Sequence, residues 1–404
     1  MMENRWTMNQ QNNNRIKIFR GFFFCRREVL FVPFLFFFSF SFSRTYEDSC
    51  RQQITLSFAG DMMCHMPQIH AAYVEEADSF DFSPSFAFLK PYFSHTDIAV
   101  VNLETTFGGK PYSGYPQFSA PAALARAAKD AGLHYFVMAN NHCYDRGAAG
   151  FEKTLQTLDS LQIIHTGVFR NRRERDTTYP LIIRKKGFTI ALLNYTYGTN
   201  GIAVTPPHIV NNIDTARIAA DIDSCLRFSP DIVIACMHWG TEYERKPNAR
   251  QEQLAQWLIK KGCHAVIGSH PHVVQPVRVY FPESKDSSCM NVVYFSLGNF
   301  LSNQRDRYRD GGIIAELTFE KNEKTRLIKF NYLPFWVYKG TLHGRYHYYA
   351  IPVMLFLKQP GMFPLPETEK AKMLEFYNDT RQWLHHIPEN DFFALPDQQQ
   401  NTTP

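Results

Sequence analysis

The sequence has 404 residues, 45% hydrophobic and 15% aromatic, which is enough apolar surface for one large folded domain or two smaller ones. This composition excludes a disordered or fibrous protein. The formal net charge is +5, but eight basic residues stand against four acidic ones in the first 51 positions, so most of that charge belongs to the N-terminal segment. The remainder is nearly neutral and lacks the basic footprint of a nucleic-acid-binding protein, so we expect no nucleic acid as a partner.

Residues 1–50 have the three parts of an export signal, namely a basic segment up to Arg27, an apolar run over 29–42 and a polar stretch. The run of about fourteen apolar residues is shorter than the roughly 20 that span a bilayer, which favours a cleaved signal peptide. No clear cleavage site follows, so an uncleaved signal anchor stays open, and Cys50 leaves a lipoprotein as a third alternative. We expect an exported protein, periplasmic or on the cell surface, that is membrane-anchored if the leader is retained.

From residue 54 onward, short β-branched or aromatic runs alternate with helical stretches, a pattern typical of an α/β domain. We predict strands at 54–59, 97–103, 135–138, 163–166, 189–195, 231–237, 265–267 and 292–296. The apolar spacing predicts helices at 122–131, 149–161, 214–228 and 249–261. After residue 305 we expect antiparallel sheet-edge strands at 313–319 and 325–333, an aromatic-rich segment to residue 349, and a helix over 367–384.

These patterns divide the chain into a leader, a main domain at 51–335, a C-terminal extension at 336–397 that packs on this domain, and a disordered polar tail at 398–404. The eight cysteines form no CxxC pair and so no zinc framework. In an oxidising compartment Cys64 and Cys143 could pair, because each follows a motif expected at one site. Buried free thiols are an equally good interpretation.

Metal-binding side chains gather where the predicted strands end. Six of them follow five strands: Asp61, Glu104, Asn141, His238, His270 and His272. In an open α/β sheet, ligands bind in the crevice beyond the carboxyl ends of the strands, so we expect these loops to meet. Singly, the acidic and amide residues would be read as turn or cap residues, but together with three histidines they indicate a metal site.

The count of ligands fits two divalent metal ions. Carboxylates, an amide oxygen and imidazoles suit Mn, Fe or Zn, and two ions about 4 Å apart need a bridging carboxylate. One arrangement gives the first ion Asp61, Glu104 and His272, and the second ion Glu104, Asn141, His238 and His270. Glu104 is then the bridge. An extended conformation at 270–272 would send both histidines to the same side.

His142 is left over beside a predicted ligand. It could donate a proton to a leaving oxygen or stabilise charge on a phosphoryl group, and Asp145 could orient it. A supporting hydrogen-bonding role for His142, and a turn role for Asp145, are the alternatives. Trp239, Glu242 and Asn299 are candidate substrate-binding residues, although an aromatic residue beside a strand end more often packs in the core.

Six ordered motifs carry a resemblance to a known family. They are Gly60-Asp61-Met62-Met63, Asn102-Leu103-Glu104, Asn141-His142 with Asp145, His238-Trp239-Gly240, Gly268-Ser269-His270-Pro271-His272 and Ser296-Leu297-Gly298-Asn299-Phe300. This set resembles the CapA family of bacterial poly-gamma-glutamate capsule biosynthesis proteins, over roughly residues 54–317. The family is related to calcineurin-like metallophosphoesterases, so the resemblance implies a four-layer αββα sandwich of metallophosphoesterase type, with C-terminal strands and a terminal helix, and a two-metal site.

The sequence departs from the wider phosphoesterase pattern at two ligands. The usual Asp-x-His opening is absent, because Met62 and Met63 follow Asp61, and the bridging aspartate is replaced by Glu104. His65 could supply the missing imidazole, although an exposed loop histidine is the more ordinary interpretation. Metal spacing and affinity are therefore expected to differ from those of the phosphoesterases.

Two functions follow from these residues and the resemblance. The first is a metal-dependent hydrolase or transferase of phosphoester type acting outside the cytoplasm, with an anionic polymer or phosphoester substrate. The second is a non-catalytic accessory subunit of a membrane polymer synthesis or export complex that binds anionic polymer. In the second case the aromatic segment at 335–349 and the leader would serve docking to synthase or export subunits.

Overall fold

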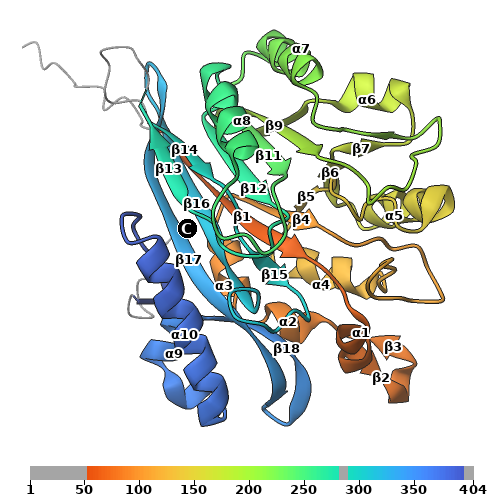
Figure 1. Ribbon diagram of the computed structural model, residues 1–404, viewed down its shortest axis with the longest axis vertical. Coiled ribbons are helices and arrows are strands. Elements are labelled where there is room, and N and C mark those ends of the chain that lie inside the picture. The colour runs from red at the N-terminus through yellow and green to blue at the C-terminus, as the bar shows by residue number, and fades with distance from the viewer. Residues whose placement is uncertain (1–51, 282–289, 395–404) are drawn as a thin grey trace, which may run out of the picture. The chain divides into compact units, whose positions relative to one another are not determined.

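Two β-sheets face each other, and helices cover the outer face of each sheet (Figure 1). The computed structural model describes residues 52–281 and 290–394. The predicted leader and polar tail lie outside these residues. No helix of the described segments has both the length and the apolar character needed to span a bilayer.

The first sheet has the strand order β18-β17-β16-β1-β4-β5-β6, with β15 paired to β1. Its strands are β1 (Gln52–Met62), β4 (Ile98–Leu103), β5 (Tyr135–Val137), β6 (Ile164–Thr166), β15 (Asn299–Leu301), β16 (Gly311–Lys321), β17 (Thr325–Leu342) and β18 (Arg345–Pro352). β1, β4, β5 and β6 run parallel, whereas β16, β17 and β18 extend the sheet antiparallel. The sheet edge on the antiparallel side is therefore β18. The two C-terminal strands that were predicted at a sheet edge are β16 and β17, and they lie inside the sheet.

The second sheet has the order β13-β14-β12-β11-β9-β8. Its strands are β8 (Leu181–Lys185), β9 (Phe188–Thr196), β11 (Ile232–His238), β12 (Ala265–Ser269), β13 (Val277–Tyr280) and β14 (Asn291–Tyr294). The central β9, β11, β12 and β14 are parallel. Two short antiparallel pairs lie outside the main sheets: β2 (Tyr73–Val74) with β3 (Ser79–Phe80), and β7 (Val168–Phe169) with β10 (Ile209–Val210).

Strand alternation assigns each apolar side chain to one of three cores. In β1, Leu56 and Phe58 point into the core between the sheets, whereas Ala59 and Met62 point to the outer core of the first sheet. Because successive side chains of a strand point to opposite faces, two-sided burial requires nearly continuous apolar runs, as the sequence has. The four-layer αββα sandwich predicted from the sequence is thus confirmed by its three cores.

Helices of the first half of the chain cover the first sheet, and two later helices cover the second. The first group is α1 (Met66–Ala72), α2 (Ser83–Phe86), α3 (Lys90–His95), α4 (Ala123–Asp130) and α5 (Gly147–Ser160). The second sheet is covered by α7 (Thr215–Cys225) and α8 (Ala249–Lys260), and α6 (Arg172–Thr178) lies before β8. The short helices α1 to α3 were absent from the sequence prediction, because their few turns carry too little apolar periodicity.

The C-terminal part completes the core between the sheets. α9 (Val353–Lys358) and α10 (Glu367–Trp383) contribute Val353, Met373 and Phe376 to that core. The predicted domain end at residue 335 falls inside β17, which runs on to Leu342. The aromatic segment at 335–349, for which docking was predicted, supplies buried side chains such as Trp336 as well as the half-exposed Tyr346.

Two glycines let the strands that carry the site approach other backbone closely. A Cβ atom at Gly60 would lie 2.0 Å from the carbonyl oxygen of Gly298, and one at Gly268 would lie 1.9 Å from that of Phe295. Real side chains do not tolerate such contacts. Any other residue at either position would push apart the strand ends that hold the site.

The described cysteines are free and buried: Cys64, Cys143, Cys225, Cys236 and Cys263. Burial raises the pKa of the Cys64 and Cys143 thiols. Of the two interpretations left open by the sequence, the structure therefore shows free thiols.

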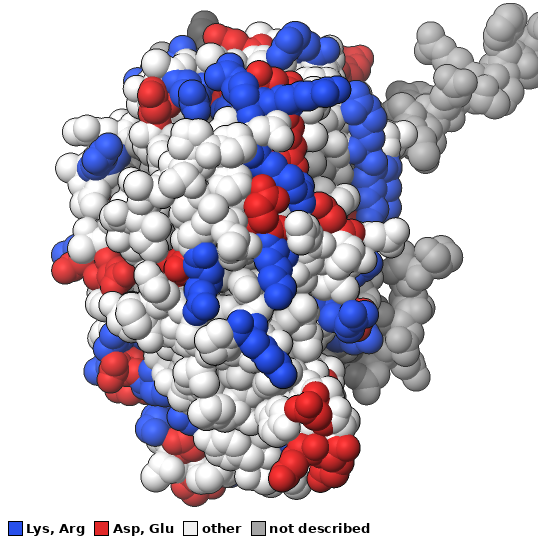
Figure 2. All heavy atoms as spheres, turned by 90° about the vertical axis from the view of Figure 1, so that its right-hand side faces the viewer, with Lys and Arg blue, Asp and Glu red and all other residues white. Residues whose placement is uncertain are grey.

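On the face seen in Figure 2, basic and acidic side chains are interspersed and do not gather into one continuous basic surface.

Replacing Phe376 with alanine tests whether α10 belongs to the folded domain. Phe376 is 3% exposed in the core between the sheets, so we expect Phe376→Ala to lower the free energy of unfolding by about 3–5 kcal/mol. Leu374, on the same helix but 36% exposed, is the matched control, and Leu374→Ala should cost roughly 0.5 kcal/mol. Equal small losses in urea denaturation would show that α10 is not part of the cooperative unit.

Candidate metal centre

The site lies where the carboxyl ends of the parallel strands of both sheets meet. In the first sheet, Asp61 lies at the end of β1 and Glu104 directly follows β4. In the second sheet, His238 ends β11 and the 270–272 bend follows β12. The six residues predicted as ligands are all buried, with at most 4% exposed: Asp61, Glu104, Asn141, His238, His270 and His272. The structure therefore brings together five chain segments that are spread over more than two hundred residues of the sequence.

Asp61, Glu104 and His272 form one group, in which potential ligand atoms lie within 4.8 Å of one another. His272 Nδ1 is 3.0 Å from Asp61 Oδ2, and His272 Nε2 is 3.7 Å from Glu104 Oε1. The backbone N–H of His270 donates to the Asp61 carboxylate over 3.2 Å. These contacts hold Asp61 in place while leaving its carboxylate facing the group.

Glu104, His238 and His270 form a second group within the same 4.8 Å limit. His238 Nε2 lies 3.5 Å from Glu104 Oε1 and 2.7 Å from Asn141 Oδ1. Glu104 thus belongs to both groups, which together hold five of the six predicted ligands, and the sixth, Asn141, contacts the second group through His238. A third group joins Glu242 to His270 and His272, so Glu242, predicted to bind substrate, lies among the potential ligands.

The backbone around the two histidines differs from the sequence prediction. His270 has φ +97° and His272 has φ +59°, so the segment is a bend and not an extended stretch. Such conformations cost non-glycine residues on the order of 1–3 kcal/mol and persist only where surrounding contacts impose them. The bend turns both imidazoles toward Glu104 and Glu242. The two side chains thus converge as predicted, but through a bend and not through the alternation of a strand.

Burial sets the charges of the site. Burial, and then repulsion from Asp61, raise the pKa of Glu104 well above its ordinary value. Burial, and then the neighbouring histidines, lower the pKa of His238 well below its ordinary value and that of His270 to about 3. The imidazoles of His238 and His270 are therefore neutral at physiological pH, which is the form that binds metals.

The donor set fits a divalent cation. Glu104 Oε1 and His270 Nδ1 are buried without a hydrogen-bond partner in the described structure. Such unpaired polar atoms are costly inside a protein unless an ion or water satisfies them. A cation beside Glu104 would satisfy both atoms and offset the repulsion between the two buried carboxylates, and the oxygen and nitrogen donors suit Mn, Fe or Zn.

Asn102 connects the two buried carboxylates by hydrogen bonds, a role that was not predicted from the sequence. Its Nδ2 donates to Asp61 Oδ1 over 2.8 Å and to Glu104 Oε2 over 3.4 Å. Asn140 in turn donates to Asn102 Oδ1 over 3.2 Å. The position of Asn102 two residues before Glu104 in a buried strand was the available signal, because both side chains then point to the same face.

His142 and Asp145 lie beside the ligands and form a buried pair. His142 Nδ1 is 2.7 Å from Asp145 Oδ2, which also accepts a hydrogen bond from the Phe118 backbone N–H. The Phe118 ring packs edge-on against His142, with centroids 4.7 Å apart. Both members of the pair, with Asn141 and Glu242, line a cleft of about 380 Å³. The pair is thus positioned to act on a ligand in that cleft.

The remaining predicted residues have different surroundings. Trp239 is 2% exposed, donates to the Phe295 carbonyl and packs in the outer core, and it also lines a cavity of about 200 Å³ beside the site. Asn299 is buried beside Asp61 and donates to the Arg309 carbonyl, so it supports the loop after β15. His65 caps α1 and is outside the three ligand groups of the described residues.

Tyr197 and Asn200 complete the site and were missed. The Tyr197 ring is 4.5 Å from the ring of His270 and nearly parallel to that of His238, and Tyr197 is 48% exposed. Asn200 accepts a hydrogen bond from Asn141 and lies 3.5 Å from His142 Nδ1. Both follow β9, whose end carries no acidic or histidine residue, so the sequence offered no chemical signal there.

These layers and this buried group of carboxylates and histidines define an αββα protein with a candidate divalent-metal centre. Residues 55–304 match the family model described as "Bacterial capsule synthesis protein PGA_cap". The match covers more than half of the chain, and the chain therefore belongs to this family of bacterial capsule synthesis proteins. The resemblance to CapA proteins is confirmed.

Two curated relatives match at low identity. The capsule biosynthesis protein CapA of Bacillus anthracis is 26% identical over 65% of this chain and 63% of its own length. The PGA biosynthesis protein CapA of Bacillus subtilis is 28% identical over 67% of this chain and 68% of its own. The chain thus spans about two thirds of the length of each.

Solved structures align more loosely. The NAD nucleotidase of Haemophilus influenzae aligns with a TM-score of 0.45 and 10% identity, over 81% of this chain and 63% of that protein. The calcineurin-like phosphoesterase YfkN of Bacillus subtilis aligns with a TM-score of 0.43 and 11% identity, over 83% of this chain and 99% of that protein. The fold assignment rests on the strand order and the three cores described above.

Removing metal should make the protein sensitive to acid through its buried histidines. Unfolded His270 takes up a proton below about pH 6.5, whereas the folded protein does so only near pH 3, so stability falls as the pH falls between these values. For the chelator-treated protein, His270 alone should lower the free energy of unfolding by about 2 kcal/mol between pH 7 and pH 5. Denaturation of His270→Ala should show a shallower pH dependence, whereas exposed His70→Ala should keep the wild-type slope.

Replacing the carboxylate shared by both groups should weaken metal binding. Glu104→Gln keeps the shape of the side chain but removes the negative charge, so we expect divalent-metal affinity to fall by at least 10–100-fold, a range seen even for groups that only support ligands. Calorimetric titration and elemental analysis measure the affinity and the bound equivalents. The exposed Glu323→Gln is the control, and unchanged binding in Glu104→Gln would remove this residue from the centre.

Proposed function

We propose that this protein is a metal-dependent hydrolase or transferase of phosphoester type that acts outside the cytoplasm in the synthesis of an anionic capsule polymer. The observation that carries the proposal is the buried Glu104 carboxylate, which belongs to two adjacent ligand groups with three histidines and Asp61. A carboxylate in that position suits two divalent ions. Beside it lies a buried histidine and aspartate pair that opens on a cleft.

The residues of the site have two roles in this proposal, namely binding the metal ions and transferring a proton. Asp61, Glu104, Asn141, His238, His270 and His272 would hold two divalent ions, which when bound would polarise a phosphoryl oxygen and activate water for attack. Asp145 holds the His142 ring by accepting from Nδ1. The other ring nitrogen of His142 then donates a proton to the leaving oxygen.

The family suggests the substrate. Both curated relatives are named for capsule or PGA biosynthesis, so the substrate proposed here is a poly-gamma-glutamate chain or a phosphoester intermediate of its assembly. Partners would be membrane synthase or export subunits, and the location periplasmic or on the cell surface. Nucleic acid is not proposed, consistent with the interspersed charges seen in Figure 2.

A second candidate is a non-catalytic accessory subunit that binds the polymer. It is favoured by Met62 and Met63, which are both buried directly after Asp61 and supply no imidazole to the first ligand group. With fewer ligands, that group would bind its ion more weakly. Such a centre would hold an anionic chain without cleaving a bond.

Replacing His142 with alanine separates the two candidates. His142 is outside the ligand groups of the described residues, so His142→Ala should keep its bound metal while turnover of a generic phosphodiester falls by about 10²–10⁴-fold. Asp145→Asn should lower turnover less, because the ring keeps a hydrogen-bonding partner. Turnover is measured spectrophotometrically and metal by elemental analysis.

The exposed His70→Ala serves as the control and should behave as wild type. Turnover that persists in His142→Ala would discard the proposed proton donor. A wild-type protein that holds two metal equivalents, cleaves no phosphoester or peptide substrate and co-purifies with synthase subunits would establish the accessory role.

A further inference from the structure

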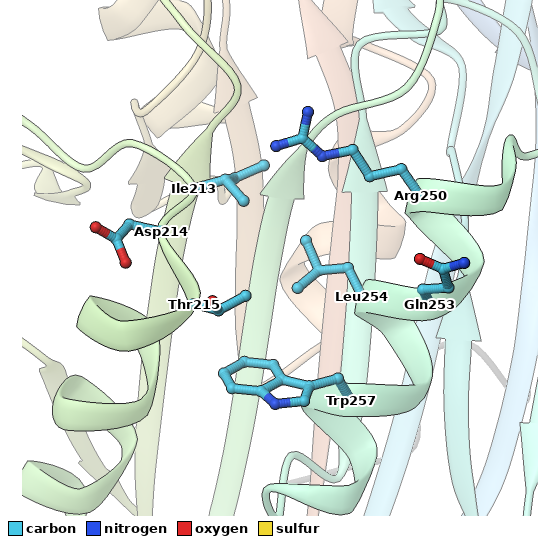
Figure 3. A pocket seen from close by; sticks show the side chains of 7 residues that line it. All are labelled: Ile213, Asp214, Thr215, Arg250, Gln253, Leu254 and Trp257. Atoms are coloured by element: carbon cyan, nitrogen blue, oxygen red, sulfur yellow. The ribbon is translucent and has the colours of Figure 1, made fainter.

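A cavity outside the metal centre opens between the starts of α7 and α8 (Figure 3). It has a volume of about 550 Å³, with walls formed by Ile213 and Thr215 on one side and by Arg250, Leu254 and Trp257 on the other. We call it the Arg250 groove. None of these residues belongs to a metal-ligand group or to the His142 pair. The groove therefore has no part in the chemistry described so far.

Arg250 is a cation without a partner. It is exposed and has no hydrogen bond or ion pair within the described residues. By contrast, Arg278 of β13 pairs with Glu252, which lies on α8 together with Arg250. Figure 3 shows its guanidinium reaching across the opening toward Ile213. The acidic residue of the groove, Asp214, forms no ion pair with Arg250, because its side chain points away from the groove and caps α7 by accepting from two backbone N–H groups. A bound anion would thus meet an uncompensated positive charge.

The groove continues toward the metal centre. A second cavity of about 200 Å³ shares Ile213, Arg250 and Leu254 with it and is bounded at its other end by Tyr197 and Gly240. The Tyr197 ring lies 4.5 Å from that of the ligand-group residue His270. One exposed aromatic ring therefore separates the groove from the site, and a chain lying in the groove could pass over Tyr197 to reach it.

We propose that the Arg250 groove binds an extended polycarboxylate chain and directs it to the metal centre. Arg250 pairs with a carboxylate in the planar, two-pronged geometry that guanidinium groups favour. Leu254 and Trp257 contact the methylene segments between carboxylates. A gamma-linked glutamate chain has both features, a carboxylate on every unit and methylene groups in its backbone. This inference rests on the proposed function for the identity of the chain, but not on any catalytic step.

Direct binding measurements test the groove independently of turnover. Labelled poly-gamma-glutamate oligomers are titrated with purified protein and followed by fluorescence anisotropy at low and physiological salt. We expect Arg250→Ala to weaken binding at least tenfold and Arg250→Lys to weaken it less, because lysine keeps the charge but not the two-pronged geometry. Arg227→Ala, which removes an exposed charge after the far end of α7, should bind as wild type. Thermal melts confirm that each variant is folded.

Two further probes define the ligand. The same oligomers with amidated carboxylates should bind at least tenfold more weakly, and inorganic polyphosphate, which has no methylene groups for Leu254 and Trp257 to contact, should bind more weakly than the unmodified oligomers. Equal binding by wild type and Arg250→Ala, or an Arg250-dependent preference for polyphosphate, would overturn the proposal. Wild type that turns over a phosphodiester but binds no oligomer overturns the groove alone. Binding through Arg250 without turnover supports the groove and rejects only the proposed hydrolase.

Discussion

The burial of Glu104 is the constraint on which the rest of the site depends. Its carboxylate is fully buried, close to a second carboxylate, and its Oε1 has no hydrogen-bond partner in the described structure. Taking an ionised carboxylate out of water is costly unless opposite charge compensates it. The neighbouring histidines are themselves kept neutral by burial, so they do not provide that charge. A divalent cation would resolve this conflict, and the candidate centre is where the two sheets offer it ligands.

The two sheets supply the precision that such a place needs. Asp61 and Glu104 come from neighbouring parallel strands of one sheet, and the three histidines come from the other, so packing of the sheets fixes their separation. Gly60 and Gly268 permit the close backbone approach at both strand ends. Asn102 links Asp61 to Glu104 by hydrogen bonds. The positive φ angles of His270 and His272 are strain that this surrounding structure maintains.

Around this centre the surface divides into two approaches. The cleft lined by His142 and Asp145 lies on one side, and Tyr197 with the Arg250 groove lies on another. A hydrolase acting on a polymer needs both a proton donor at the bond and a hold on the chain away from it. Remote contacts of this kind position a substrate and contribute binding energy without taking part in bond cleavage. The accessory-subunit function would need the groove but not the histidine pair.

The sequence by itself determined the α/β class, the main strands and the six potential ligands, because strand periodicity and residue chemistry are local properties. It also predicted the shared role of Glu104 from donor count. Only the tertiary structure decided that 270–272 is a bend, that Trp239 and Trp336 are buried, and that β17 crosses residue 335. It alone placed Asn102, Tyr197 and Arg250, since their neighbours come from distant segments. Which face of an element is covered depends on how layers pack, and a single sequence does not encode that packing in any local pattern.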